Sequence, residues 1–263
     1  MELRGKRVVV TGASRGIGEE LARQFAAKGA TVAVIARSVE PLEKLAADTG
    51  GRAYPADLMD RSVRDGLVAR IEADGPIDVL INNAGLLDTV AFSAISPADI
   101  DGIIDVNLHA PIQLARAALP GMIARGSGKI VDISSMAGAS CTPGVVTYSA
   151  TKAGLTHFNA CLRDELRGTG VGNLVVELGP VDTEMQAMLH SHGPTHRSMV
   201  RLRQLRLIRH LPVPRVAASI VRAVEKDSNY LRMPKRAAAF PVVAALPRQM
   251  GRLLLAGVDR SSN

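Results

Sequence analysis

One stretch of the chain decides its fold: Arg7-Val8-Val9-Val10-Thr11-Gly12-Ala13-Ser14-Arg15-Gly16-Ile17-Gly18. It begins as a short apolar strand, and a helical pattern follows it from Glu19 to Lys28. Because glycine has no Cβ, a turn with three glycines lets the backbone approach a phosphate closely, and the first N–H groups of the helix point at the anion. The spacing G-x-x-x-G-x-G differs from the commoner dinucleotide fingerprint G-x-G-x-x-G. Taken alone, the stretch fits either a phosphate-binding turn or a plain tight connection.

The rest of the chain repeats this alternation of strand and helix. Apolar strand-like runs separated by helical stretches are typical of a parallel sheet covered by helices on both faces. We therefore predict an α/β fold with one doubly wound sheet, formed by residues 1–263 as a single domain. Ligands of such sheets bind beyond the carboxyl ends of the strands. The predicted strands are Val8–Val10, Thr31–Ala36, Val79–Ile81, Ile130–Ser134 and Leu174–Leu178.

Three side chains downstream could handle a proton. Tyr148 and Lys152 stand four residues apart, and Ser135 lies thirteen residues before Tyr148. Residues i and i+4 share a face of a helix, so the Lys152 ammonium can lie near the Tyr148 hydroxyl. A cation there would lower the phenol pKa from its usual value of roughly 10 toward the range of a general base. The spacing by itself also fits an ordinary helix face.

Five motifs in order make the chain resemble the classical short-chain dehydrogenase/reductase family, from about Leu3 to Met233. The resemblance implies a Rossmann-type fold, an NAD(P)-dependent oxidoreductase and a homodimer or homotetramer. The motifs are the glycine loop (Thr11, Gly12, Gly16 and Gly18), Asn82-Asn83-Ala84-Gly85, Asn107, Ser135, and Tyr148 with Lys152.

The resemblance also implies a role for each residue. Tyr148 is then the general acid/base, Ser135 hydrogen-bonds the substrate oxygen, and Asn107 supports a water in a proton relay. Lys152 lowers the Tyr148 pKa and holds the nicotinamide ribose. The implied cofactor contacts are Gly12, Ser14, Arg15, Gly16, Ile17, Gly18, Arg37, Asp57, Leu58, Asn83, Ala84, Gly85, Tyr148, Lys152, Gly179, Val181 and Thr183.

The chain departs from the family pattern after the sixth strand, where the family usually has Pro-Gly and this chain has Leu178-Gly179-Pro180. Pro180 can stiffen the turn one position later by fixing its own φ. Gly179 and Thr183 remain in register, so we keep Thr183 as a predicted cofactor contact. Leu178 is expected to alter the nicotinamide pocket slightly.

The end of the second strand indicates which cofactor is preferred. An acidic residue there would bind a ribose 2′-hydroxyl, but Arg37 and Ser38 stand there instead. Arg37 and Arg15 offer two guanidinium groups for a 2′-phosphate. We therefore predict NADP(H) as the preferred cofactor, with NAD(H) as the alternative. Asp57, which resembles the family's adenine contact, fits a turn aspartate equally well.

Charge is distributed unevenly along the chain, whose net charge is +7. Residues 1–190 carry 18 Lys and Arg against 22 Asp and Glu, whereas residues 191–263 carry 14 against 3. The basic part overlaps a predicted substrate-covering lobe, 184–215, and a basic and apolar extension, 236–263. Such a surface indicates acidic partners such as phospholipid headgroups or phosphorylated or acyl-carrier substrates, unless it is simply solvated. Nucleic acid is not expected, because aromatic interleaving is missing.

The extension 236–263 is open to two interpretations. Its apolar runs are flanked by arginines, which fits peripheral membrane contact. Pro241 and Pro247 interrupt a continuous helix, so docking on a neighbouring subunit or over the substrate site fits equally well.

The expected substrate pocket is apolar, which favours a lipophilic alcohol or ketone. Cys141 is either part of its wall or, as the preferred interpretation, a small buried filler. The predicted substrate contacts are Ser135, Met136, Val145, Tyr148 and Met185, with Leu86, Leu87, Ala137, Val146, Met188 and Leu189 as further lining.

Composition and motifs together favour an enzyme. The mixed charge at the start of the chain and its short apolar runs predict a cytoplasmic protein, with peripheral membrane contact as an addition. Cys141 and Cys161 are expected to be free thiols, and no metal site is expected. The leading hypothesis is an NADP(H)-dependent oxidoreductase that interconverts a lipophilic alcohol and its ketone or aldehyde. The alternative is an NADP(H)-binding sensor or scaffold protein whose basic C-terminal region engages a membrane or partner.

Overall fold

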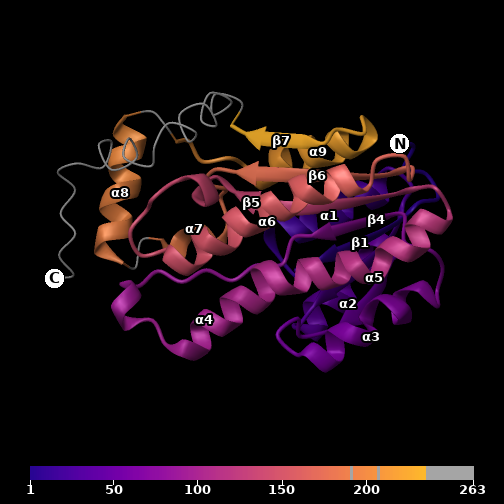
Figure 1. Cartoon of the computed structure of the whole chain (residues 1–263), viewed down its shortest axis with the longest axis horizontal. Coiled ribbons are helices and arrows are strands. Elements are labelled where there is room, and N and C mark those ends of the chain that lie inside the picture. The colour runs from indigo at the N-terminus through magenta and orange to yellow at the C-terminus, as the bar shows by residue number, and fades with distance from the viewer. Residues whose placement is uncertain (190–191, 206–207, 235–263) are drawn as a thin grey trace.

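A single parallel sheet organises the computed structural model, which describes residues 1–189, 192–205 and 208–234. Its order is β3-β2-β1-β4-β5-β6-β7, so the predicted doubly wound α/β fold is confirmed (Figure 1). The chain order reverses between β1 and β4, and parallel sheets bind ligands at such a switch point. The strands are β1 (Arg7–Thr11), β2 (Thr31–Ala36), β3 (Arg52–Pro55), β4 (Val79–Asn82), β5 (Gly128–Ser135), β6 (Val171–Leu178) and β7 (Tyr230–Met233).

All five predicted strands are present, and two edge strands, β3 and β7, lie outside that set. The sequence of β7 lacks a continuous apolar run because it alternates Tyr230 and Arg232 with Leu231 and Met233. Arg232 is nevertheless buried, since its guanidinium forms an ion pair with Glu177 of β6. A charge compensated from the next strand cannot be seen in the local pattern.

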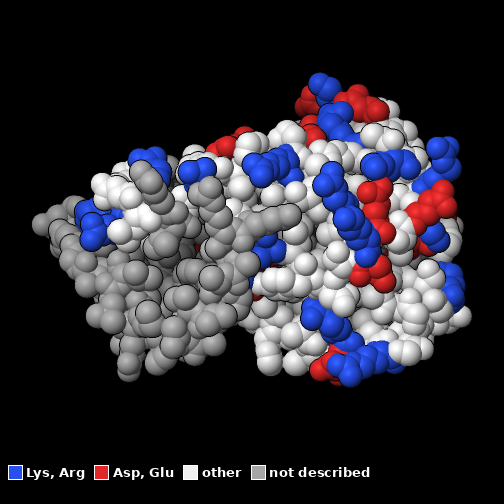
Figure 2. Space-filling model, turned by 90° about the horizontal axis from the view of Figure 1, so that it is seen from above, with Lys and Arg blue, Asp and Glu red and all other residues white. Residues whose placement is uncertain are grey.

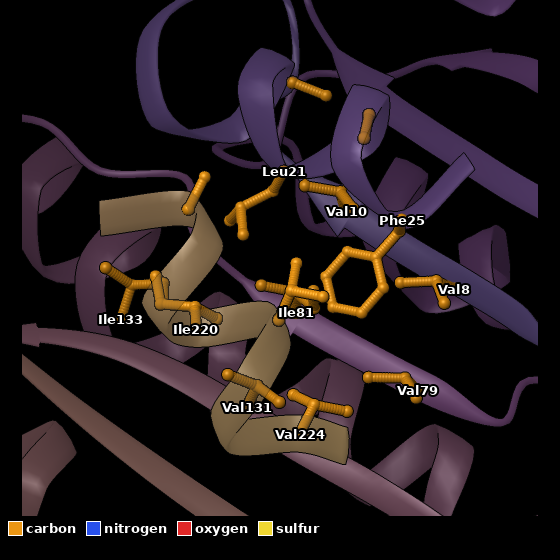
Figure 3. Packing of buried hydrophobic residues seen from close by; sticks show 14 of the residues in the cluster. Val8, Val10, Leu21, Phe25, Val79, Ile81, Val131, Ile133, Ile220 and Val224 are labelled. Carbon is orange, nitrogen blue, oxygen red and sulfur yellow. The ribbon is translucent and has the colours of Figure 1, made fainter. Parts of the chain in front are cut away.

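The two faces of the sheet carry separate apolar cores. Val8 and Val10 face one core with Phe25 and Ile220, whereas Val9 faces the other, as the alternation of a strand requires (Figure 3). The first face is covered by α1 (Gly16–Ala27), α2 (Val39–Thr49) and α9 (Val213–Glu225). The second is covered by α3 (Arg61–Glu72), α5 (Ala110–Ala124) and α6 (Val146–Glu165).

The remaining elements lie toward the carboxyl ends of the strands. Helix α4 (Pro97–Ile104) runs through a π-helical turn, Asp105–His109, into α5. Figure 1 shows α7 (Glu184–Met188) and α8 (Gly193–Gln204) beyond the strand ends; they are the main described elements of the predicted lobe 184–215. The predicted extension 236–263 lies outside the described residues. No described helix combines the length and apolarity that crossing a bilayer requires.

Candidate active site

A cleft of about 1100 Å³ opens at the carboxyl ends of the strands. Loops after β1, β2, β3, β4, β5 and β6 all contribute to its wall, so motifs far apart in the sequence meet there. Every predicted cofactor and substrate contact lines it except Gly18, which is buried below the glycine loop. Asn107, predicted as catalytic, is also buried outside the lining.

Two glycines are required by close packing in the glycine loop. Gly12 has φ +65°, and a Cβ there would lie 2.7 Å from the Ala84 Cα. A Cβ on Gly18 would lie 2.3 Å from the Gly12 carbonyl oxygen and 2.6 Å from the Asn83 Nδ2. Any larger residue would push the loop away from the end of β4 or from the start of α1, so this tight cradle depends on glycine.

Thr11 and Asn83 fasten the ends of β1 and β4 together. The Thr11 Oγ1 accepts hydrogen bonds from the backbone N–H groups of Asn83 (2.9 Å) and Ala84 (3.0 Å), and it donates to the Ile81 carbonyl (3.2 Å). The Asn83 Nδ2 donates to the carbonyls of Thr11 (2.9 Å) and Gly12 (3.2 Å). These contacts fix the glycine loop at the switch point of the sheet.

The arginine end of the cleft contains both predicted guanidinium groups. Arg15 and Arg37 are exposed and line the cleft. Arg15 forms an ion pair with Glu184 at the start of α7, where both side chains are about three-quarters exposed. The Asp57 Oδ1 accepts from the Met59 N–H (2.9 Å), which is the turn contact the sequence also allowed. An anion at this end would meet two cations, one of which already has a partner.

At the other end of the cleft, which we call the hydroxyl end, Ser135, Tyr148 and Lys152 lie together. Tyr148 and Lys152 both lie on α6, with the Lys152 Nζ 5.7 Å from the centre of the tyrosine ring. The Lys152 Nζ donates to the Ile133 carbonyl (2.8 Å), which holds the ammonium between β5 and α6. Ser135 ends β5, and its hydroxyl accepts from the Ala137 N–H (3.1 Å) and donates to the Leu178 carbonyl (3.4 Å).

Burial controls the pKa values of Tyr148 and Lys152. It raises the pKa of Tyr148, and hydrogen bonding with Ser135 opposes the rise only in part. The predicted net lowering of the Tyr148 pKa is therefore not seen, because desolvation of the phenol outweighs the hydrogen bond with Ser135. Burial also lowers the pKa of Lys152 to about 8, against the opposing charge of Asp132.

Asn107 occupies the π-helical turn and is fully buried. Its Oδ1 accepts from the Leu86 N–H (2.7 Å), and its Nδ2 donates to the Leu86 carbonyl (2.8 Å) and to the Thr151 Oγ1 (3.2 Å). The amide thus joins the loop after β4 to the helix of Tyr148. Its part in a water relay stays a prediction.

The wall beside the hydroxyls is largely apolar, with two differences from the predicted lining. Val146 and Met188 are 46% and 48% exposed and do not line the cleft, because Val146 begins α6 facing outward and Met188 borders a smaller neighbouring cavity. Cys141 is exposed on the cleft wall, so its preferred interpretation as a buried filler is wrong. Side chains from the lobe that were not predicted also line the cleft: Met199, Leu202 and Ile208.

The turn after β6 keeps its place despite Leu178. Leu178 is 5% exposed and lines the cleft, and its carbonyl receives the Ser135 hydroxyl. The Thr183 Cγ2 lies 3.5 Å from the position of a Cβ on Gly16, so this turn faces the glycine loop. Gly179 and Thr183 therefore border the same cleft as the glycine loop, as predicted.

One charged residue at the site was missed by the sequence prediction. Asp132 stands inside the predicted strand Ile130–Ser134 and is completely buried. Burial raises its pKa to about 6, although two amides donate to it. A carboxylate inside an apolar run was a usable signal, but its relation to Lys152 depends on tertiary packing.

The described basic residues do not form an unbroken patch on the face shown in Figure 2. Lys and Arg side chains alternate there with Asp and Glu over the described part. On the lobe, Arg201 and Arg203 of α8 are exposed, while His210 contacts Asp182 (2.9 Å). The predicted membrane or partner contact stays a prediction.

The residues present fit a nicotinamide dinucleotide. The glycine cradle would hold the pyrophosphate, Arg15 and Arg37 would face the adenosine ribose, and Lys152 could reach the nicotinamide ribose. The cleft leaves room beside Tyr148 for a substrate. This arrangement can donate a proton to an oxygen whose carbon lies next to the nicotinamide.

Comparison with known proteins identifies the family of the chain. The family model for short chain dehydrogenases matches residues 6–193. The chain is 43% identical over 180 residues to the ketoacyl reductase HetN from Nostoc sp. (strain PCC 7120 / SAG 25.82 / UTEX 2576), which covers 66% of this chain and 63% of that protein.

Solved structures show the same architecture. A short-chain dehydrogenase from Streptomyces avermitilis superposes with a TM-score of 0.80 at 30% identity, covering 98% of this chain and 99% of the other. One from Sphingobium yanoikuyae in complex with NADPH has a TM-score of 0.78 at 26% identity, with 98% of each chain covered. The family match, the fold and the site give one conclusion: the chain belongs to the short-chain dehydrogenase family, oxidoreductases that act on CH–OH groups with NAD(P).

Proposed function

We propose that the enzyme uses NADP(H) to interconvert a lipophilic alcohol and its ketone or aldehyde. The observation that carries the proposal is the position of Tyr148 and Ser135 at one end of a cleft whose adjoining wall is apolar. Met136, Val145 and Leu202 belong to that wall, so an apolar substituent on the reacting carbon would be buried there. A sugar or polyol would leave its hydroxyls facing these side chains.

The preference for NADP(H) rests on the arginine end of the cleft. Arg37 follows β2 where an acidic residue would favour the unphosphorylated ribose, and Arg15 lies on the same wall. Arginine binds phosphate through several charge-assisted hydrogen bonds. The NADPH bound to the Sphingobium relative supports the same choice.

In the reducing direction, the bound nicotinamide supplies the hydride to the carbonyl carbon. Ser135 donates a hydrogen bond to the carbonyl oxygen, and Tyr148 transfers its proton to that oxygen as negative charge develops. The raised pKa of Tyr148 keeps the phenol protonated near neutral pH, as a proton donor requires. The Lys152 ammonium, fixed on the Ile133 carbonyl, keeps positive charge close to the developing alkoxide.

Replacing Tyr148 by Phe tests this assignment. NADPH oxidation should be followed with a panel of hydrophobic ketones and aldehydes. Tyr148→Phe should lose at least about a hundredfold in kcat, since general acid catalysis typically contributes 10²–10⁴-fold, while NADPH binding persists.

The matched control is Tyr54→Phe, because Tyr54 lies on β3 and its hydroxyl contacts Asp74 outside the cleft. The control should retain full turnover. Undiminished turnover in Tyr148→Phe would refute the mechanism. NADPH binding by the natural protein without oxidation across the whole panel would favour the sensor or scaffold alternative.

A further inference from the structure

Strand β5 packs against α6, the helix of Tyr148 and Lys152, and directs polar side chains toward it. The Ser134 Oγ contacts the Thr156 Oγ1 (2.7 Å) and donates to the Lys152 carbonyl (3.0 Å). Two residues earlier on β5, the Asp132 Oδ2 accepts from the Asn159 Nδ2 (2.7 Å). The contacts fall on residues 152, 156 and 159 of α6, one turn apart, so they lie along one side of the helix. They fix the position of the helix that carries Tyr148 and Lys152 relative to β5.

Asp132 differs from the other members of this row because it carries a charge. It is completely buried, and its second oxygen, Oδ1, accepts from the Asn82 Nδ2 (2.8 Å). Two amides satisfy hydrogen bonds but leave the negative charge uncompensated, and a buried charge is costly without a cation. Packing alone would have been served by a neutral residue.

Lys152 is the cation that acts on Asp132, although the two buried side chains form no direct ion pair. The positive charge of Lys152 favours the ionised carboxylate, and the negative charge of Asp132 favours the ammonium. The other elements packed against these two side chains contribute neutral groups. Asn82 from β4 lies against Asp132, whereas Asn107 from the π-helical turn and the Tyr148 phenol of α6 lie near Lys152. The Lys152 Nζ also binds the carbonyl of Ile133, the residue that follows Asp132.

We infer that Asp132 is a positioning residue of the catalytic site, whose buried carboxylate locks α6 onto β5 and keeps the Lys152 amine protonated. Without that negative charge, the low-polarity surroundings would favour the neutral amine. The inference rests on the proposed function only in its kinetic consequence. The electrostatic pairing of the two side chains stands independently of turnover.

Asp132→Asn tests the role of the charge while preserving shape. The buried Asn82 Oδ1 has no hydrogen-bond partner, so a flip of the Asn82 amide could accept from the new amide. Removing the negative charge should shift the alkaline limb of kcat/KM for reduction to lower pH by about one unit. Thr156→Val is the matched control because it removes a contact of the same row without changing charge. It should lower thermal stability and leave the pH limb in place.

A second measurement needs no turnover and no folded variant of Asp132. In the cofactor-free natural protein with 13C-labelled lysine, the Lys152 signal is assigned by comparison with Lys152→Met. That signal should show its main titration near the pKa of about 8 and a smaller inflection near pH 6, where Asp132 takes up its proton. A single inflection would overturn the inference. An unshifted alkaline limb in folded Asp132→Asn would overturn it too, whereas absent turnover in the natural protein would count against the proposed function alone.

Discussion

Gly18→Ala provides a stringent test of the phosphate cradle. The added methyl group would lie 2.3 Å from the Gly12 carbonyl oxygen and 2.6 Å from the Asn83 Nδ2. Since unstrained contacts lie near 3.5 Å, α1 and the glycine loop must separate by about 1 Å. Overpacking of this kind typically costs about 1–3 kcal/mol, and the Asn83 hydrogen bonds at risk are worth about 1 kcal/mol each. We expect the free energy of unfolding to fall by about 2–4 kcal/mol.

The same separation would also move the backbone N–H groups that would bind the pyrophosphate of the cofactor. NADPH affinity, measured by fluorescence titration, should fall at least about tenfold, which corresponds to about 1.4 kcal/mol. Urea unfolding gives the stability.

Gly66→Ala is the control, because Gly66 lies within α3 with open space around its Cβ position. It should stabilise the protein by roughly 0.5–1 kcal/mol and leave NADPH affinity unchanged. If Gly18→Ala matched this control in both measurements, the packing argument would be refuted.

Two further substitutions test other parts of the cleft. Thr11→Val leaves the N–H groups of Asn83 and Ala84 without their acceptor, so the free energy of unfolding in urea should fall by about 2–3 kcal/mol. Thr11→Ser keeps the hydroxyl and should recover most of this loss. Equal losses in both variants would contradict the hydrogen-bond argument. Arg37→Ala should raise the KM for NADPH about tenfold, as expected for a lost charge-assisted hydrogen bond, and leave the KM for NADH unchanged. Equal changes in KM for both cofactors would count against a contact between Arg37 and the 2′-phosphate.

The strands and the glycine turn of this enzyme are easier to predict from sequence than its buried charged residues. The five predicted strands and the glycine turn depend on local pattern, so they are visible in one dimension. The hydrogen bond between Asp132 and Asn159 joins β5 to α6 across the fold, and only the packed structure shows which side chains meet. The predicted lowering of the Tyr148 pKa is likewise not seen, because spacing shows the nearby cation but not the extent of burial.

Residues that shape the substrate side were the least predictable. Leu202 and Ile208 reach the cleft because the lobe passes over the strand ends, a placement that local sequence does not encode. Val146 neighbours Val145 in sequence, yet Val145 lies just before α6 and lines the cleft, whereas Val146 begins the helix and faces outward.

The two faces of the sheet should tolerate sequence change differently over evolutionary time. On the face of Phe25 and Ile220, apolar side chains interlock without directional bonds, and volume-conserving exchanges there usually cost less than about 1.5 kcal/mol. Beneath α6, Asp132 and Ser134 bind partners at hydrogen-bond distance, so each exchange has to be matched by one on the opposite element. Divergence among relatives should therefore accumulate under α1 and α9, while changes under α6 should arise in compensating pairs.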